Sequence, residues 1–283
     1  MSGFLAQMAR ASRERARAAR LVCPEAALLE QALSVPPPPP LARDAAGFDL
    51  ITELKLRSPA VGQLRSAAEN VGVRVCAYAR AGAAAVSVLT EPTRFDGSMT
   101  HLTEAVQALT PLRVPVMRKD FLVDPYQLME ARLARASGVL IILRMLPREH
   151  IQELLDCARL LGLFVLLEAF DEGDIELMHD LAGAGQTGDL FAGVNCRDLS
   201  TLQVVPQRLI QLCPLLPAHL PRVAESGVAS AADAGRVAAV GYELALVGSA
   251  LMQGADPEAL AVAMLQEGRA ARHPSVRSAH GCG

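Results

Sequence analysis

The sequence predicts a (β/α)8 TIM barrel with an N-terminal helical extension. Short apolar, β-branched runs alternate with segments of helical periodicity eight times. Eight such alternations within about 220 residues are typical of a closed parallel barrel inside a ring of helices. The structural alternative is a doubly wound open sheet, but no G-x-G-x-x-G motif follows the first predicted strand. The barrel is therefore the preferred fold class.

Residues 1–46 are expected to form the helical extension and a proline-rich spacer. An alanine-rich stretch over residues 4–20 and the run PEAALLEQAL both have helical periodicity. The prolines of VPPPPP form a stiff, extended segment that ends the extension. Arginines recur at helical spacing and are expected to form a solvent-exposed helix face: Arg10, Arg13, Arg15, Arg17 and Arg20.

The barrel itself is predicted over residues 47–270. Helical segments between the strands begin near Asp or Ser and end near Gly, as helix caps require. Residues 271–283 are expected to be a disordered tail. The predicted strands cover residues 48–55, 84–91, 114–121, 138–146, 163–170, 190–197, 221–227 and 243–251.

The composition is that of a globular protein and argues against several kinds of partner. Hydrophobic residues make up 51% and charged residues 20% of a 283-residue chain, which is long enough to bury a sizeable core. No apolar run reaches the roughly 18 residues of a membrane-spanning helix, and the N-terminus lacks a secretory signal pattern. A net charge of −3 and a pI near 6.1 indicate no affinity for nucleic acid. We therefore expect a cytoplasmic protein that binds neither nucleic acid nor a membrane.

The cysteines are scattered and form no C-x-x-C pair or metal-ligand spacing with histidine. Buried free thiols are the expected state, except for Cys282, which is expected to be exposed in the tail. The sequence therefore predicts no metal site.

Lysine is rare, since only Lys55 and Lys119 occur among 27 lysines and arginines. Arginine almost never gives up its proton, whereas burial can bring the pKa of a lysine into the working range. One hypothesis is that both lysines do acid–base chemistry. The alternative is that two lysines remain at these positions by chance.

Polar residues follow most of the predicted strands at their carboxyl ends, where barrel enzymes place their active sites. Glu53 and Lys55 lie two positions apart, so they share one face of the first strand. At the barrel mouth that face opens into a pocket. A purely structural ion pair is the alternative, but burying one costs several kcal/mol per ion. The further strand-end residues are Glu91, Lys119, Glu168, Asn195, Arg197, Glu225 and Ser226.

The segments AESG and VGSA follow the seventh and eighth strands, where barrels commonly bind phosphate. Glycine lets backbone N–H groups approach a ligand, and a following short helix adds a positive N-terminal end. Gly227, Gly248 and Ser249 are the candidates. Small residues at tight strand exits need no ligand, so each motif is weak alone.

Seven motifs in consistent order carry a resemblance to a known family: ITELKLRSP, SVLTEPTRFDGS, VMRKDFLVDPYQ, VLLEAFDE, GVNCRDLSTL, RVAESGV and LVGSALM. Over nearly its whole length the chain resembles indole-3-glycerol-phosphate synthases of tryptophan biosynthesis. The resemblance implies ring closure of 1-(2-carboxyphenylamino)-1-deoxyribulose 5-phosphate to indole-3-glycerol phosphate, with loss of carbon dioxide and water. It implies no cofactor, a small phosphorylated substrate, and an extension that helps to cover the active site. It leaves association with other tryptophan-pathway enzymes open.

The resemblance also implies roles for individual residues. Lys119 is the expected general acid at the carbonyl, held or tuned by Glu168. Lys55 is expected to assist dehydration and contact the substrate carboxylate, with Glu53 as its acid–base partner. Asn195 and Glu225 are expected to orient hydroxyl groups. The remaining expected contacts are Arg197, Phe95, Phe121, Leu140 and Ile142 around the anthranilate ring, Ser226 on the substrate, and Ser58, Gly227, Gly248 and Ser249 on the phosphate.

Three positions depart from the family pattern. Ala60 replaces the second serine of a Ser-Pro-Ser motif, Leu56 replaces a common basic residue, and Cys196 is unusual between Asn195 and Arg197. The alternative function is therefore a paralogous TIM-barrel lyase or isomerase acting on a related amino-sugar phosphate. A barrel that has lost its activity is a third hypothesis, but it requires decay at catalytic positions, and none is visible.

Overall fold

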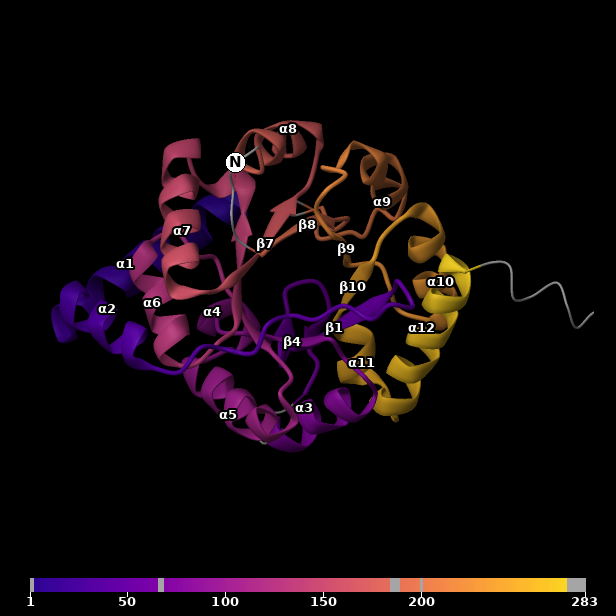
Figure 1. Ribbon diagram of the computed structural model, residues 1–283, viewed down its shortest axis with the longest axis horizontal. Helices are drawn as coiled ribbons and strands as arrows, with labels where there is room; N and C mark the ends of the chain where they lie inside the picture. The colour runs from indigo at the N-terminus through magenta and orange to yellow at the C-terminus, as the bar shows by residue number, and fades with distance from the viewer. Residues whose placement is uncertain (1–2, 66–68, 184–188, 199–200, 274–283) are drawn as a thin grey trace, which may run out of the picture.

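Eight parallel strands form a closed barrel in the order β1–β10–β9–β8–β7–β6–β5–β4, which confirms the predicted fold class. The computed structural model describes residues 3–65, 69–183, 189–198 and 201–273. Each barrel strand lies inside a range predicted from the sequence. Figure 1 shows the strands enclosed by a ring of helices. The strands are β1 (Asp49–Leu54), β4 (Ala85–Leu89), β5 (Val116–Lys119), β6 (Gly138–Ile142), β7 (Phe164–Ala169), β8 (Leu190–Asn195), β9 (Arg222–Glu225) and β10 (Leu244–Val247).

The outer ring follows the strands in chain order. Its helices are α3 (Val71–Arg80), α5 (Met99–Leu109), α6 (Pro125–Leu133), α7 (Arg148–Leu161), α8 (Glu172–Leu181), α9 (Gln207–Leu212), α10 (Ala231–Val240) and α12 (Pro257–Arg272). Side chains of Asn70, Ser98, Asp124, Asp171, Ser230 and Asp256 cap helix N-termini by accepting backbone N–H bonds. Helix α12 extends two residues into the predicted tail, and residues 274–283 lie outside the described residues.

Short elements complete the mouth of the barrel. Helix α4 (Pro92–Phe95) follows β4, helix α11 (Ser249–Gln253) follows β10, and a small hairpin of β2 (Arg57–Ser58) and β3 (Gly62–Gln63) follows β1. Three single-turn 3₁₀ helices cover Thr110–Leu112, Leu143–Met145 and Cys213–Leu215. The elements that directly follow β1, β4, β6 and β10 lie at the carboxyl ends of the strands, whereas the 3₁₀ helices at Thr110–Leu112 and Cys213–Leu215 follow outer helices and lead into the amino ends of β5 and β9.

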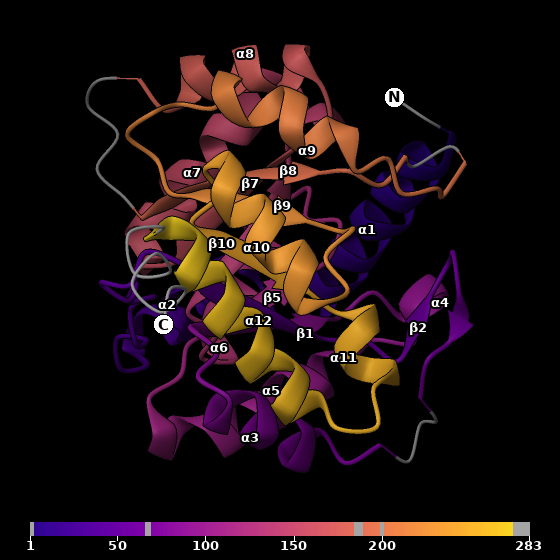
Figure 2. The same cartoon turned by 90° about the vertical axis from the view of Figure 1, so that its right-hand side faces the viewer.

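The N-terminal extension consists of α1 (Gly3–Val22), α2 (Glu25–Ser34) and an irregular proline segment. In Figure 2, α1 lies toward the end of the barrel that carries α4 and β2, and α2 lies toward the other end. Arg15 pairs with Asp120 at 2.7 Å, and Arg20 pairs with Asp124 at 2.6 Å. The prediction of a solvent-exposed arginine face is therefore wrong for Arg15 and Arg20. It is confirmed for three residues that are exposed, namely Arg10, Arg13 and Arg17.

Glycine permits close packing between neighbouring strands of the barrel wall. A Cβ atom built on Gly138 of β6 would come within 3.0 Å of the Phe164 ring on β7. Gly138 starts its strand and lies outside the cavity at the mouth. A side chain at this position would therefore disturb the wall without reaching the mouth.

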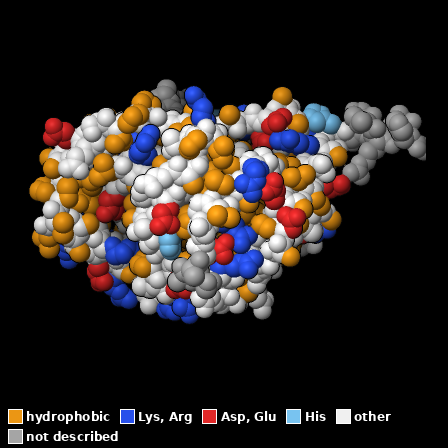
Figure 3. Space-filling view, turned by 90° about the horizontal axis from the view of Figure 1, so that it is seen from below, with side chains coloured by type: hydrophobic (Ala, Val, Ile, Leu, Met, Phe, Trp, Pro, Cys, Tyr) orange, Lys and Arg blue, Asp and Glu red, His pale blue; other side chains and the backbone are white. Residues whose placement is uncertain are grey.

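The surface and the thiols agree with the composition. The face in Figure 3 intersperses basic and acidic side chains without a large field of one sign. In the part of the chain that the structure describes, no helix is long and apolar enough to cross a membrane, and no group of side chains could hold a metal ion. The prediction of buried free thiols is confirmed for Cys157, Cys196 and Cys213, whereas Cys23 and Cys76 are half-buried. Cys282 lies outside the described residues.

Candidate active site

A cavity of about 390 Å³ lies at the carboxyl ends of the barrel strands. Every residue that the sequence singled out as catalytic or substrate-binding lines it. Because these residues come from all parts of the chain, the closure of the barrel is what brings them together. They are Glu53, Lys55, Ser58, Phe95, Lys119, Phe121, Leu140, Ile142, Glu168, Asn195, Arg197, Glu225, Ser226, Gly227, Gly248 and Ser249.

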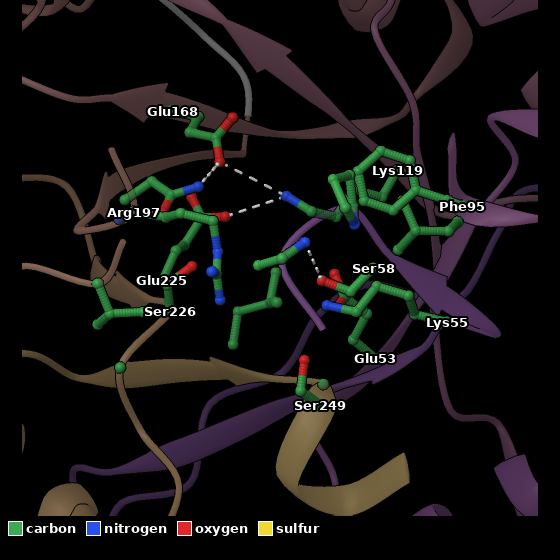
Figure 4. A pocket seen from close by; sticks show the side chains of 18 of the residues that line it. Glu53, Lys55, Ser58, Phe95, Lys119, Glu168, Arg197, Glu225, Ser226 and Ser249 are labelled. Carbon is green, nitrogen blue, oxygen red and sulfur yellow. Dashed lines mark hydrogen bonds and ion pairs between the residues drawn. The ribbon is translucent and has the colours of Figure 1, made fainter. Parts of the chain in front are cut away.

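Lys119, the last residue of β5, lies between two carboxylates. Its Nζ is 3.2 Å from Glu225 Oε2 and 3.5 Å from Glu168 Oε1. Glu168 Oε1 also accepts a hydrogen bond of 2.7 Å from Asn195 Nδ2. Figure 4 shows the ammonium group reaching across the cavity toward both carboxylates. The cluster therefore combines one proton donor with two acceptors in a largely buried position.

The charges of this cluster shift the pKa values of its members. Burial alone lowers the pKa of Lys119, but Glu168, Glu225 and Glu53 raise it above its ordinary value. Burial, followed by the charge of Glu168, raises the pKa of Glu225 to about 8 against the opposing effect of Lys119. The site thus holds a firmly charged lysine and a glutamic acid that titrates near neutral pH.

Glu53 and Lys55 form a second lysine–carboxylate pair, on β1 and just after it. Lys55 Nζ lies 2.5 Å from Glu53 Oε1, and the side chains are 13% and 3% exposed. Gly248 makes room for this pair, since a Cβ atom there would come within 3.0 Å of the Glu53 carboxylate. The two residues share the inward face, as their spacing predicts, and Lys55 keeps access to the cavity.

Backbone contacts fix the orientation of the polar residues after β8. Asn195 Oδ1 accepts a hydrogen bond of 2.9 Å from the N–H of Arg197, so its amide nitrogen points toward Glu168. Arg197 Nη1 donates to the carbonyl oxygen of Leu202 at 2.8 Å. Both side chains are held before any ligand arrives.

Aromatic side chains form one wall of the cavity. The rings of Phe95 and Phe121 lie 6.0 Å apart, and the Phe4 ring meets Phe121 edge-on at 5.8 Å. Leu140 and Ile142 are buried beside them. Phe4 was not among the predicted site residues, because periodicity places it in a helix but cannot show which part of that helix covers the barrel. This wall is suited to a flat apolar ring.

The opposite side of the cavity is lined by small residues. Ser226 and Gly227 both have positive φ angles, 65° and 73°, which turn the backbone sharply after β9. A Cβ atom on Gly227 would come within 3.0 Å of Cys196 Sγ, so the unusual cysteine packs under this turn. Gly248 immediately precedes α11. Backbone groups are thereby accessible at both strand exits.

Glu91 differs from the other strand-end residues, because it does not line the cavity. Its carboxylate accepts backbone N–H bonds from Thr93 and Arg94, and so caps α4. Other lining residues were not singled out by the sequence, because apolar side chains carry no chemical signal and because the chain position of Asp120 does not show that its carboxylate reaches the cavity. They include Asp120, Phe170, Leu202, Val204 and Leu246.

A closed parallel barrel with two buried lysine–carboxylate groups at its mouth defines an enzyme of acid–base chemistry on a small substrate. The family model for indole-3-glycerol phosphate synthase matches residues 19–264, so the chain belongs to that family.

Similar proteins support this assignment. Indole-3-glycerol phosphate synthase of Parafrankia sp. (strain EAN1pec) is 38% identical over 90% of this chain and 91% of its own length. The synthase of Nocardioides sp. (strain ATCC BAA-499 / JS614) is 41% identical over 76% of this chain and 78% of its own. Among solved structures, 3-hexulose-6-phosphate synthase from Salmonella typhimurium has a TM-score of 0.60 at 15% identity, covering 80% of this chain and all of that chain. At such low identity the likeness extends to the fold alone.

Proposed function

We propose that this protein catalyses the ring closure of 1-(2-carboxyphenylamino)-1-deoxyribulose 5-phosphate to indole-3-glycerol phosphate, with release of carbon dioxide and water. The observation that carries the proposal is the pair of lysine–carboxylate groups in one cavity. Lys119 lies between Glu168 and Glu225, and Lys55 lies against Glu53. The reaction protonates one oxygen atom twice, first as the ketone and then as the leaving hydroxyl group, and the cavity has a lysine for each step.

The first step is attack of the aromatic carbon on the substrate ketone. Negative charge develops on the ketone oxygen, and the Lys119 ammonium stabilises it and donates a proton. The carboxylate of Glu168 keeps Lys119 protonated until then, because among the neighbouring charges it raises the Lys119 pKa most. Loss of carbon dioxide then restores the aromatic ring.

The second step removes the new hydroxyl group as water. Lys55 protonates the leaving oxygen, and Glu53 accepts the proton that leaves the adjacent ring carbon. Each turnover delivers two protons to oxygen and removes one proton from carbon. Because the substrate carboxylate is ionised when it leaves as carbon dioxide, each turnover takes up one proton overall. Solvent supplies that proton through the open mouth of the cavity.

Binding groups surround these two centres. Phe95, Phe121, Leu140, Ile142 and Arg197 line the anthranilate side, and Lys55 contacts the substrate carboxylate. Asn195, Glu225 and Ser226 orient the hydroxyl groups of the sugar chain. Its phosphate binds at the small-residue side of the cavity, namely Ser58, Gly227, Gly248 and Ser249.

The direct test is to incubate the protein with the carboxyphenylamino-deoxyribulose phosphate and follow indole fluorescence. The chain contains no tryptophan, so the product signal rises above a low protein background. A dephosphorylated analogue is expected to bind far more weakly. Folded protein that yields no indole contradicts the proposed reaction, and equal binding of the analogue contradicts the phosphate site.

One observation favours a second candidate, a lyase or isomerase for a related amino-sugar phosphate. Ala60 lines the cavity close to Ser58, at the position where the family pattern has a serine. The missing hydroxyl removes one hydrogen-bond donor near the phosphate side. Turnover of such a sugar phosphate in place of the carboxyphenylamino substrate selects this candidate.

The proposal extends to the cell. A cytoplasmic location fits an enzyme whose phosphorylated substrate cannot cross a membrane unaided. Association with other enzymes of tryptophan biosynthesis is tested by pull-down with the full chain. Recovery of no such enzyme contradicts that part of the proposal.

A further inference from the structure

Gly193 occupies the centre of the acid–base cluster although it has no side chain. It lies on β8 directly opposite Glu168 of β7 in the strand register. On the other side of β8, Asn195 is the register partner of Glu225 of β9. Gly193 is two residues before Asn195, which lines the cavity, so both positions face the barrel interior. Gly193 therefore lies between two strands that each contribute a carboxylate.

Space, not backbone conformation, explains the glycine at this position. Gly193 lies in a regular strand and is not among the glycines with positive φ, so the backbone accommodates any L-residue. A Cβ atom built there would come within 3.0 Å of Glu225 Oε1 and of Leu166 Cδ1. The carboxylate of Glu225 thus fills the volume that a side chain at residue 193 needs.

The same carboxylate oxygen, Glu225 Oε1, accepts no hydrogen bond from the residues that the structure describes. Glu225 itself is 1% exposed. Its Oε2 atom faces Lys119 Nζ at 3.2 Å. A buried carboxylate with one unpartnered oxygen is costly when ionised and far less so when it carries a proton.

We propose that Gly193 is a positioning residue, whose missing side chain lets Glu225 lie close to Glu168 and hold a proton beside Lys119. This inference rests on the proposed function, in which Lys119 loses a proton to the substrate. Glu225 then returns a proton to the Lys119 amine and becomes a carboxylate. Solvent restores the proton on Glu225 before the next turnover, which balances the one proton that the reaction consumes.

The surrounding charges support this arrangement. Lys119 on β5 and Glu168 on β7 face Glu225, and Glu53 on β1 acts on Lys119 from farther away. One ammonium group cannot neutralise both nearby carboxylates. Burial and Glu168 together raise the pKa of Glu225 to about 8, which keeps it protonated at neutral pH.

The test is Gly193→Ala, with kcat and KM measured across pH. The added methyl group displaces the Glu225 carboxylate, and we expect kcat to fall about 100-fold, as displacements of about 1 Å at catalytic groups do. KM is expected to change much less. We expect the kcat profile of the parent protein to have an alkaline limb near pH 8, set by Glu225, and we expect this limb to move to lower pH in the variant as Glu225 separates from Glu168. An unchanged kcat and pH profile overturns the proposal.

Gly138→Ala is the matched control. Its Cβ atom overlaps the Phe164 ring in the same barrel wall, but outside the cavity. We expect it to lower the thermal midpoint without moving the pH profile. A similar displacement of the profile in both variants shows a general effect of strain in the wall and overturns the positioning role.

A titration of the parent protein tests whether Glu225 holds a proton near neutral pH, even when Gly193→Ala does not fold. Glutamate carboxyl carbons are labelled with ¹³C and followed by NMR, with Glu225→Gln identifying the signal. We expect Glu225 to titrate near pH 8, and titration in the ordinary range of glutamate overturns the proposal. This measurement needs no turnover. A raised pKa of Glu225 without indole formation refutes the proposed reaction alone. An ordinary pKa of Glu225 together with indole formation refutes this inference alone.

Discussion

Lys119 shows how neighbouring charges outweigh burial at a single residue. The sequence hypothesis was that burial brings the lysine pKa down into the working range. Burial does act in that direction, but Glu168, Glu225 and Glu53 raise the pKa above its ordinary value. The expected lowering of the pKa is therefore wrong for Lys119, and Glu225 is the group of this cluster that titrates near neutrality.

The first prediction concerns Lys119→Arg. The variant keeps the positive charge between the two carboxylates, so substrate binding is expected to change little. Arginine donates its proton poorly at neutral pH, and loss of general acid catalysis is expected to lower kcat about 100-fold or more. Steady-state kinetics by indole fluorescence measures the effect. A kcat near that of the parent protein removes the general-acid role from Lys119.

The second prediction concerns the pH dependence of stability. The pKa of Glu225 is raised from 4.5 to about 8 in the folded protein, so between these values the folded state binds more protons than the unfolded state. Glu225 therefore lowers stability progressively as pH rises from about 4.5 to about 8. Glu225→Gln removes this effect. We expect the variant to match the parent protein at pH 5 and to have the higher thermal midpoint at pH 8.5.

Glu104→Gln is a suitable control for that comparison. Glu104 belongs to α5 on the outside of the barrel and lies apart from the Lys119 cluster. Its amide variant is expected to change the thermal midpoint by similar amounts at both pH values. A gain that is independent of pH in Glu225→Gln contradicts the raised pKa.

Strands and helices were more predictable than the contacts between them. Alternating apolar runs identified all eight barrel strands, because β-branched runs and helix caps are local signals. The resemblance implied that the extension helps to cover the active site, but the contacts of α1 were not predicted, because Arg15 and Arg20 meet Asp120 and Asp124 about a hundred residues away in the sequence. The role of Glu91 was also not predictable from the sequence, since a carboxylate at the end of a strand can either bind a substrate or cap the N-terminus of the following helix.

The third prediction tests the docking of α1. Asp120 lines the cavity next to Lys119 and binds Arg15 at 2.7 Å, while Thr90 Oγ1 donates to its other oxygen. Arg15→Ala leaves the buried Asp120 with fewer partners. We expect the thermal midpoint to fall by about 3 °C, the usual scale for a loss near 1 kcal/mol in a chain of this size. We also expect kcat/KM to fall.

Arg10→Ala is the control for Arg15, because Arg10 is an exposed residue on the same helix. It removes the same charge and leaves Asp120 untouched. Differential scanning calorimetry and steady-state kinetics should show little change in this variant. Equal losses in the two variants indicate that helix propensity or net charge matters, and not the contact with Asp120.

At the scale of the whole molecule, closure of the barrel assembles the site. Most predicted site residues lie at a strand exit or just after it, and a closed ring of strands brings all these exits to one cavity. This is why the charged and small lining residues could be predicted from the order of strands, whereas Ser58 and the apolar lining were expected only from the resemblance to the family. Phe4 could not be predicted in this way, since its position depends on how the extension packs across the mouth.

The last prediction separates the barrel from its extension. The strand hydrogen bonds close without residues 1–46, so a chain that begins at Gly47 is expected to keep the circular dichroism of the barrel at a lower thermal midpoint. It loses Phe4 from the aromatic wall and Arg15 from Asp120. Phe4→Ala isolates the first loss, and its KM is expected to rise about 3- to 10-fold, the usual worth of one aromatic contact. The shortened chain should show at least that rise together with a lower kcat, because the end of β5 has lost its support. A shortened chain with unchanged kinetics would show that the barrel alone forms the complete site.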